Sequence, residues 1–237
     1  MAGWGTHIIL ADRLLSDGLA PYLDRRGFVV GAIAPDCNIE NADWSDFTPP
    51  RETTHFMTGK SKITADYEGF YTAFIKGCHF LSEEHRAFLW GYYTHLVTDV
   101  MFTEYLHDAE RIAACFARLS EIESYQKQLA DQPKTYDTLK TVFGNTGLMQ
   151  DLSYLEYLYL SSDSNHPYHT ILRKVTAFPD YLPFLPTGAI VRKIKIMAHP
   201  ITDIPKTQLL FFSKEEYAYF LDAVCEKATA LIKDRIS

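Results

Sequence analysis

Apolar residues recur at helical spacing along most of the chain. In the first such stretch His7, Ala11 and Leu14 fall on one face, as expected when every third or fourth residue points to the same side. The stretches predicted to be helical on this basis are 5–15, 64–77, 83–118, 135–143, 148–160 and 214–234.

Local signals mark where several of these helices begin and end. Ser82 is a predicted N-cap, because Glu83 and Glu84 follow it in what would be the first turn. Ser213 and Glu216 have the spacing of a capping box. Proline, glycine and polar residues predict irregular segments over 37–54, 161–167 and 177–188, and residues 16–34 mix polar turns with an apolar run.

The pattern as a whole favours an all-α protein. No internal repeat, low-complexity tract or linker interrupts the 237 residues, and this length suits one large domain. We therefore expect residues 1–237 to form a single compact multi-helix domain.

The helix predicted over 83–118 carries two polar residues on its apolar side. An arc of about 80° on a helical wheel contains its buried face. The residues in this arc are Phe88, Tyr92, His95, Asp99, Phe102 and Leu106. A carboxylate among apolar groups is costly unless it is paired. The pair His95 and Asp99 is explained by a buried hydrogen bond between them, by an arginine from another helix, or by a metal ion that both side chains bind.

Three further residues fit the metal interpretation. His7 lies on the apolar side of the first predicted helix, Asp36 directly follows the apolar run that ends in Pro35, and His55 follows the polar loop. Taken singly, they also fit a core histidine, a turn-forming aspartate and a surface histidine. Together with His95 and Asp99 they form a set of imidazoles and carboxylates, which zinc accepts in hydrolytic sites.

Composition narrows the possible partners and the compartment. Acidic residues outnumber basic ones by 30 to 23, so we expect no large nucleic-acid footprint. No stretch approaches 18 uncharged apolar residues, and the N-terminal segment lacks the features of a signal peptide. The four cysteines form no CxxC motif. We therefore expect a cytoplasmic protein without a membrane span.

Four short motifs follow one another in the order seen in a known family. They are WGTHIILA at 4–11, GAIAPD at 31–36, THF at 54–56 and GYYTHLVTD at 91–99. This series resembles the zinc-dependent phospholipase C family, which is similar in fold to fungal single-strand-specific zinc nucleases. The resemblance implies an all-helical fold that holds up to three zinc ions.

The resemblance also implies a role for each of the five residues. His7 is similar to the histidine ligand on the family's first helix. Asp36 looks like the aspartate ligand that has also been proposed as general base, and His55 matches the histidine that completes the shell of the same ion. His95 and Asp99 resemble the helix pair in which the aspartate bridges two ions.

The sequence departs from the family pattern at two places. Secreted members use the amine and carbonyl of a mature N-terminal tryptophan as ligands, whereas Trp4 is internal here and removal of Met1 would leave Ala2. The residue spacing with which the family builds its remaining zinc site is not present in this sequence. The nearest additional ligands, for each of which a surface or structural role is favoured, are Glu104, His107, Asp151, His166 and His169. We expect one to three zinc ions, with two favoured.

The leading functional prediction is a metal-dependent phosphoester hydrolase in which a metal-activated water attacks phosphorus. Its substrate would be a small phosphoester or a lipid headgroup. One alternative is a His-Asp-type phosphohydrolase built on the doublet His107–Asp108, with His55 upstream. A second is a non-catalytic helical binding module on the same scaffold.

Overall fold

The structure is a computed structural model that describes residues 2–198 and 208–236. Its helices are α1 (Trp4–Leu14), η1 (Leu15–Leu19), α2 (Arg25–Gly31), η2 (Ala34–Asp36), α3 (Arg51–Thr54), η3 (Lys62–Thr64), α4 (Tyr67–Phe70), η4 (Tyr71–Ile75), α5 (Glu83–Leu106), α6 (Ala109–Ser120), α7 (Glu123–Leu129), α8 (Tyr136–Ser162), α9 (Pro167–Thr170), η5 (Leu172–Lys174), α10 (Ala189–Met197) and α11 (Lys214–Ile236). Two short strands, β1 (Ile39–Glu40) and β2 (Phe47–Thr48), pair antiparallel. The predicted all-α class is confirmed.

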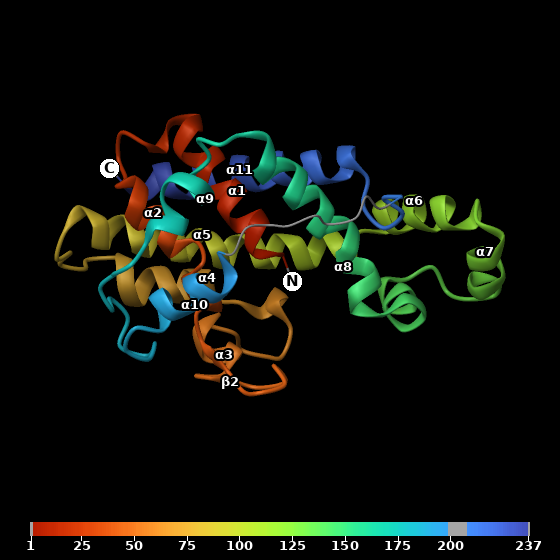
Figure 1. Ribbon diagram of the computed structural model, residues 1–237, viewed down its shortest axis with the longest axis horizontal. Coiled ribbons are helices and arrows are strands. Elements are labelled where there is room, and N and C mark those ends of the chain that lie inside the picture. The colour runs from red at the N-terminus through yellow and green to blue at the C-terminus, as the bar shows by residue number, and fades with distance from the viewer. Residues whose placement is uncertain (1, 199–207, 237) are drawn as a thin grey trace.

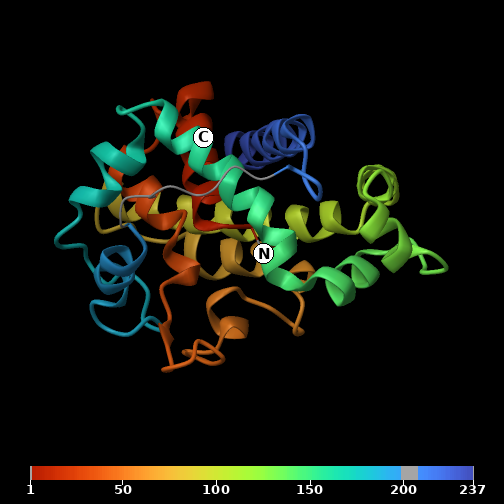
Figure 2. The same ribbon diagram turned by 45° about the vertical axis from the view of Figure 1, so that its right-hand side comes forward.

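Helix α5 is the central element of the fold. It runs along the middle of the molecule, and α1, α2 and α11 pack against it (Figure 1). Its residues from Ala87 to Asp99 are all buried, so this middle part of the helix is enclosed on every side. Helices α6 and α7 project at one end in both ribbon views (Figures 1 and 2). Because this part of α5 is enclosed, a polar side chain on it must find its partners within the protein.

Glycines allow α2 and α5 to cross at very close range. A Cβ atom added to Gly91 on α5 would collide with the carbonyl oxygen of Phe28, and one added to Gly31 on α2 would collide with that of Phe88. The two backbones are therefore in direct contact. This contact fixes the position of the chain that leaves α2 and leads to Asp36.

The predicted capping signals are confirmed. The Ser82 hydroxyl accepts a hydrogen bond from the backbone N–H of His85 at 3.0 Å, which starts α5. The Ser213 N–H donates to the Glu216 carboxylate at 2.6 Å, and the Glu216 N–H donates to the Ser213 hydroxyl at 3.1 Å, which completes the capping box of α11.

The single helix predicted over 83–118 is wrong. The chain leaves α5 after Leu106 and begins α6 at Ala109, because the Asp108 carboxylate accepts a hydrogen bond from the N–H of Arg111 and caps a new helix. The segment 37–54, predicted to be a loop, contains the two short strands and α3. Helix α2 was not predicted, since its apolar run is too short to show a helical period.

Among the described residues, no helix combines the length and the hydropathy needed to cross a lipid bilayer.

Candidate metal centre

Five side chains that are far apart in the sequence converge beside the middle of α5. His7 comes from α1, Asp36 ends η2, His55 directly follows α3, and His95 and Asp99 are one turn apart on α5. Two overlapping groups of donor atoms result, one of Asp36, His55 and His95 and the other of His7, His95 and Asp99. The structure thus brings together all five residues that the sequence predicted as ligands.

The first group lies on the side of Asp36. The Nε2 atom of His55 is 3.2 Å from Oδ1 of Asp36 and 3.3 Å from Nε2 of His95. The Nε2 atom of His95 is in turn 3.2 Å from Oδ2 of Asp99. The Asp36 side chain is 14% exposed, whereas the side chains of His55, His95 and Asp99 are fully buried. Asp36 therefore connects this group to the outside.

The second group lies on the side of His7. The ring of His7 stacks on the ring of His95, with the ring centroids 3.6 Å apart and an angle of 7° between the ring planes. The Nε2 atom of His7 is 3.7 Å from Oδ1 of Asp99. Both His7 nitrogens and Oδ1 of Asp99 are buried without a hydrogen-bond partner in the described part of the chain. Unsatisfied buried polar atoms are destabilising, so this arrangement calls for a bound group between them.

Backbone carbonyls orient two of the imidazoles. The Nδ1 atom of His95 is 2.8 Å from the carbonyl oxygen of Ala32, so its N–H is donated there and the lone pair of Nε2 faces the cluster. The Nδ1 atom of His55 has the carbonyl oxygen of Arg51 at 3.2 Å and the Thr54 hydroxyl at 3.0 Å. Metal-binding histidines characteristically use their second nitrogen in this way.

The electrostatics of the cluster favour the neutral imidazoles of His7 and His55 and the ionised carboxylates of Asp36 and Asp99. Burial lowers the pKa of His7 well below its usual value, and burial together with the Lys62 ammonium lowers the pKa of His55. Burial by itself would raise the pKa of Asp36 and Asp99, but Lys62 and the neighbouring imidazoles outweigh it and hold both pKa values well below the ordinary range. These protonation states are the ones that bind a cation.

Lys62 is the member of the cluster that the sequence did not predict. It begins η3, and its ammonium contacts Oδ2 of Asp99 and lies 2.9 Å from Nε2 of His55 and 3.7 Å from Oδ1 of Asp36. No spacing motif marks it, because it is one of two lysines in a polar segment after His55. Only the fold brings it to the cluster.

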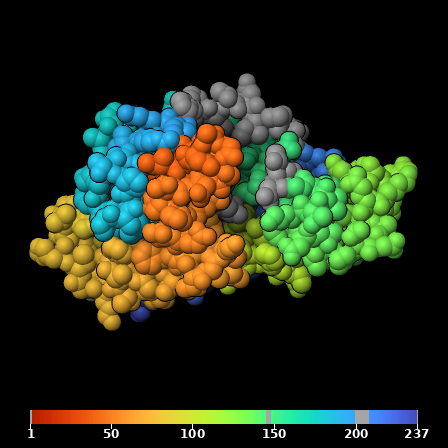
Figure 3. Space-filling view, turned by 90° about the horizontal axis from the view of Figure 1, so that it is seen from below, coloured from red at the N-terminus to blue at the C-terminus, as the bar shows by residue number. Residues whose placement is uncertain are grey.

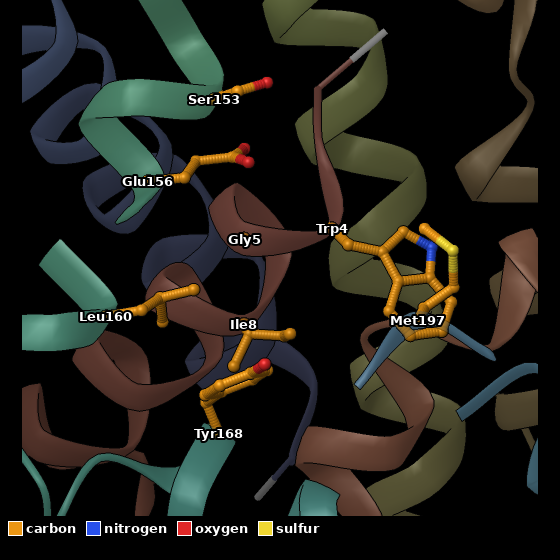
Figure 4. Close-up of a pocket in the computed structure, with 8 residues that line it drawn as sticks. All are labelled: Trp4, Gly5, Ile8, Ser153, Glu156, Leu160, Tyr168 and Met197. Carbon is orange, nitrogen blue, oxygen red and sulfur yellow. The ribbon is translucent and has the colours of Figure 1, made fainter. Parts of the chain in front are cut away.

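The helix that carries His7 is held at its N-terminus by Glu156 of α8. The Glu156 carboxylate accepts hydrogen bonds from the N–H of Thr6 at 2.8 Å and from its hydroxyl at 2.5 Å. In Figure 4 this side chain points from α8 toward the first turn of α1 at Gly5, inside a small pocket of about 170 Å³. A carboxylate at this end of a helix is favoured by the helix dipole.

A large cleft of about 930 Å³ adjoins the cluster. It is hollowed between the orange segment that follows β1 and the green part of α8 (Figure 3). Asp36 and Lys62 form the part of its wall that belongs to the cluster. The other charged and aromatic residues in its lining are Trp4, Trp44, Asp46, Phe47, Arg51, Glu52, Lys60, His107, Tyr136, Asp137, Lys140 and Lys193.

The five additional ligands considered from the sequence lie outside both donor groups. Glu104 is exposed, and Asp151 accepts hydrogen bonds from the N–H groups of Phe211 and Phe212 at 2.6 and 3.3 Å. These contacts give Asp151 a structural role.

The three histidines of that set have partners elsewhere. The exposed His107 has Nδ1 at 2.8 Å from the Thr103 carbonyl oxygen. It is the C-cap residue of α5, and the next residue, Asp108, is the N-cap of α6. His166 caps α9 by accepting a hydrogen bond from the N–H of Tyr168, and Nε2 of His169 donates to the Leu160 carbonyl oxygen at 2.8 Å.

The donor set fits zinc. Neighbouring ligands around a tetrahedral zinc ion at about 2.1 Å lie roughly 3.4 Å apart. The separations between the donor atoms of four pairs, His55–Asp36, His55–His95, His95–Asp99 and His7–Asp99, run from 3.2 to 3.7 Å. The unpartnered atoms of His7 and Asp99 supply a second argument, because a cation between them would satisfy both.

The histidines and aspartates that the helical scaffold gathers beside a cleft form a candidate metal site. A model of the family described as zinc dependent phospholipase C matches residues 6–174. The chain belongs to this family of phosphoester hydrolases, which confirms the resemblance seen in its motifs. Comparisons with curated proteins and with solved structures found no match.

Proposed function

We propose that the protein is a zinc-dependent phosphoester hydrolase of the phospholipase C type. The observation that carries this proposal is the convergence of three imidazoles and two carboxylates at ligand spacing beside the cleft. Membership of the family supports the same reaction class. His7, Asp36, His55, His95 and Asp99 would hold the zinc; Oδ1 of Asp99 lies beside His7, and its Oδ2 lies beside His55 and His95.

Zinc in such a site supplies a nucleophilic hydroxide near neutral pH and positive charge for phosphate oxygens. Asp36 is the residue of the cluster that both reaches the cleft and is ionised at neutral pH. In this proposal it takes the proton from the attacking water as a general base. His95 and His55 keep their positions through the backbone carbonyls of Ala32 and Arg51.

The substrate proposed is a small phosphoester or a lipid headgroup. The cleft volume suits a ligand of that size, and its aromatic lining suits an organic substituent on the phosphate. The net charge of −7 argues against a polyanionic substrate such as a long nucleic acid. The four cysteines are free, which supports the proposal of a reducing, cytoplasmic setting.

The first test is metal content together with turnover. Protein purified without chelator should contain zinc by elemental mass spectrometry and should hydrolyse bis-p-nitrophenyl phosphate or p-nitrophenyl phosphocholine. His95→Ala should lose both zinc and turnover. The matched variant His107→Ala removes a histidine from the same helix and should keep its zinc, since His107 lies outside the cluster.

Three results would contradict the proposal. Wild-type protein free of metal would rule out the zinc site. Zinc bound without turnover of either substrate would favour the binding module. Loss of zinc from His107→Ala but not from His95→Ala would favour the site built on the His107–Asp108 doublet.

A further inference from the structure

The Lys62 ammonium lies where the donor atoms of Asp36, His55 and Asp99 meet. It contacts Oδ2 of Asp99, and its distances to His55 Nε2 and Asp36 Oδ1 are 2.9 and 3.7 Å. The side chain is only 11% exposed, so the ammonium has exchanged water for these protein atoms. Two of the three contacted atoms, Nε2 of His55 and Oδ1 of Asp36, belong to the donor group on the side of Asp36.

The ammonium is also the only permanent cation paired with these two carboxylates in the described part of the chain. The other ion-pair partners of Asp36 and Asp99 are imidazoles. A buried carboxylate without a counterion is strongly destabilising. Lys62 therefore stabilises the metal-free cluster.

An ion and the ammonium exclude each other on this side. His55 has its Nδ1 beside the Arg51 carbonyl oxygen, so only Nε2 is left to bind a cation, and Nε2 already faces Lys62. On the other side, His7 Nε2 and Asp99 Oδ1 have no hydrogen-bond partner in the described residues. Among those residues, no lysine or arginine forms an ion pair with either atom.

We propose that Lys62 is an internal cation that occupies the Asp36–His55 side of the cluster, must leave it before an ion binds there, and thereby weakens that side relative to the His7 side. The inference rests on the proposed function. One ion binds tightly beside His7 and Asp99 Oδ1, and a second binds weakly beside Asp36 and His55. Lys62 has room to leave, because it lines the cleft and its stem is flexible.

The first experiment uses wild-type protein alone. Chelator-treated protein is titrated with Co²⁺, whose visible absorption reports each occupied site. Two separate binding steps are expected, the tighter one complete at one ion per chain. Two equal, simultaneous steps would overturn the inference, as would saturation at a single ion that is lost in His55→Ala.

The second experiment compares Lys62→Met with Lys60→Met. Both variants remove one positive charge from the same segment, but Lys60 is exposed and makes no ion pair in the described structure. By equilibrium dialysis, Lys62→Met should bind the second zinc ion on the order of tenfold more tightly, because no buried ion pair has to be broken first. Lys60→Met should match the wild type.

Thermal unfolding adds a readout in which the expected change in midpoint for Lys62→Met has opposite signs in EDTA and in zinc. In EDTA the midpoint of Lys62→Met should fall by several degrees, because Asp36 and Asp99 lose their counterion. In excess zinc its midpoint should rise more than that of the wild type. A decrease of equal size in both conditions would assign Lys62 a structural role only and overturn the inference.

The failures of the two proposals are distinguishable. Equal zinc affinity in Lys62→Met and wild type overturns the role of Lys62 and leaves the proposed function intact. An equal gain in zinc affinity in Lys60→Met would overturn the proposal that Lys62 occupies the site directly, since it would show a general effect of removing positive charge. Absence of zinc from wild type and both variants overturns the inference and the proposed function together.

Discussion

The Nδ1 atom of His95 lies 2.8 Å from the carbonyl oxygen of Ala32, directly after α2. This contact links the orientation of a predicted ligand on α5 to the position of another helix. Asp36 follows four residues after Ala32, so the same end of α2 also places the carboxylate that reaches the cleft. The geometry of the cluster therefore depends on how α2 crosses α5.

Gly91→Ala should disturb this crossing. The added Cβ would collide with the Phe28 carbonyl oxygen, and neither helix backbone is free to yield. We expect the free energy of unfolding in urea to fall by about 2–3 kcal/mol. The folded fraction should also bind less zinc. Gly59→Ala is the control, because its Cβ would meet Thr64 at an ordinary 3.4 Å; equal losses in both variants would disprove the role of the crossing.

Tyr92→Phe should loosen His55. The Tyr92 hydroxyl donates a hydrogen bond to the Thr54 carbonyl oxygen, just before His55, and burial leaves that oxygen without water. We expect a loss of about 1–2 kcal/mol in unfolding free energy and weaker zinc binding in dialysis. Tyr93→Phe removes a hydroxyl that contacts Arg235 instead, so it should leave zinc affinity unchanged. Unaltered zinc affinity in Tyr92→Phe would contradict this prediction.

Glu156 provides a pH-dependent prediction. Burial raises its pKa, although the hydrogen bonds from Thr6 oppose the shift. A carboxyl whose pKa is higher in the folded protein stabilises it fully at pH below about 4.5 and loses this contribution as pH rises through the folded value. In EDTA, Glu156→Gln should therefore gain stability relative to wild type as pH increases from 4.5. A constant difference in urea midpoint across this range would refute the assignment.

Removing the side chain altogether should have the opposite effect. Glu156→Ala removes the acceptor of the Thr6 N–H and leaves the Thr6 hydroxyl with the Tyr217 hydroxyl alone, which should cost about 1–3 kcal/mol of unfolding free energy. Because Thr6 precedes His7, zinc affinity should fall as well. Glu156→Gln keeps an acceptor and serves as the matched control. Stability of Glu156→Ala equal to that of Glu156→Gln would show that the anchor is unimportant.

The imidazoles make the metal-free protein sensitive to mild acid. The pKa values of His7 and His55 are lowered in the folded state, so the unfolded chain binds protons first as pH falls below about 6.5. Stability is then lost at up to about 1.4 kcal/mol per pH unit for each imidazole. Urea unfolding in EDTA between pH 7.5 and 5 measures the slope.

His7→Phe should reduce that slope by about one proton. Equal slopes in wild type and His7→Phe would contradict a lowered pKa at His7.

Periodicity was sufficient to predict the helical class, and it singled out His95 and Asp99 because both conflict with the apolar helix face on which they lie. His7, Asp36 and His55 also fit ordinary roles when taken singly, and they joined the predicted set through their combination with that pair and through the resemblance to the family. The break after Leu106 was missed because the apolar period continues into α6, and only the capping contact of Asp108 ends it. Lys62 and Glu156 were missed because a lysine or glutamate in a polar or helical segment looks ordinary until the fold shows its partner.

The contact between Thr6 and Glu156 spans 150 residues of sequence, which has a consequence for biosynthesis. His7 is the first of the five predicted ligands to leave the ribosome, yet the Glu156 contact at the start of its helix can form only after this part of α8 has been made. Contacts between distant parts of a chain form late, because closing a long loop is entropically costly. A nascent chain that stops before α8 would carry all five ligands without a firmly held first helix, and would be expected to take up metal only when synthesis has passed Glu156.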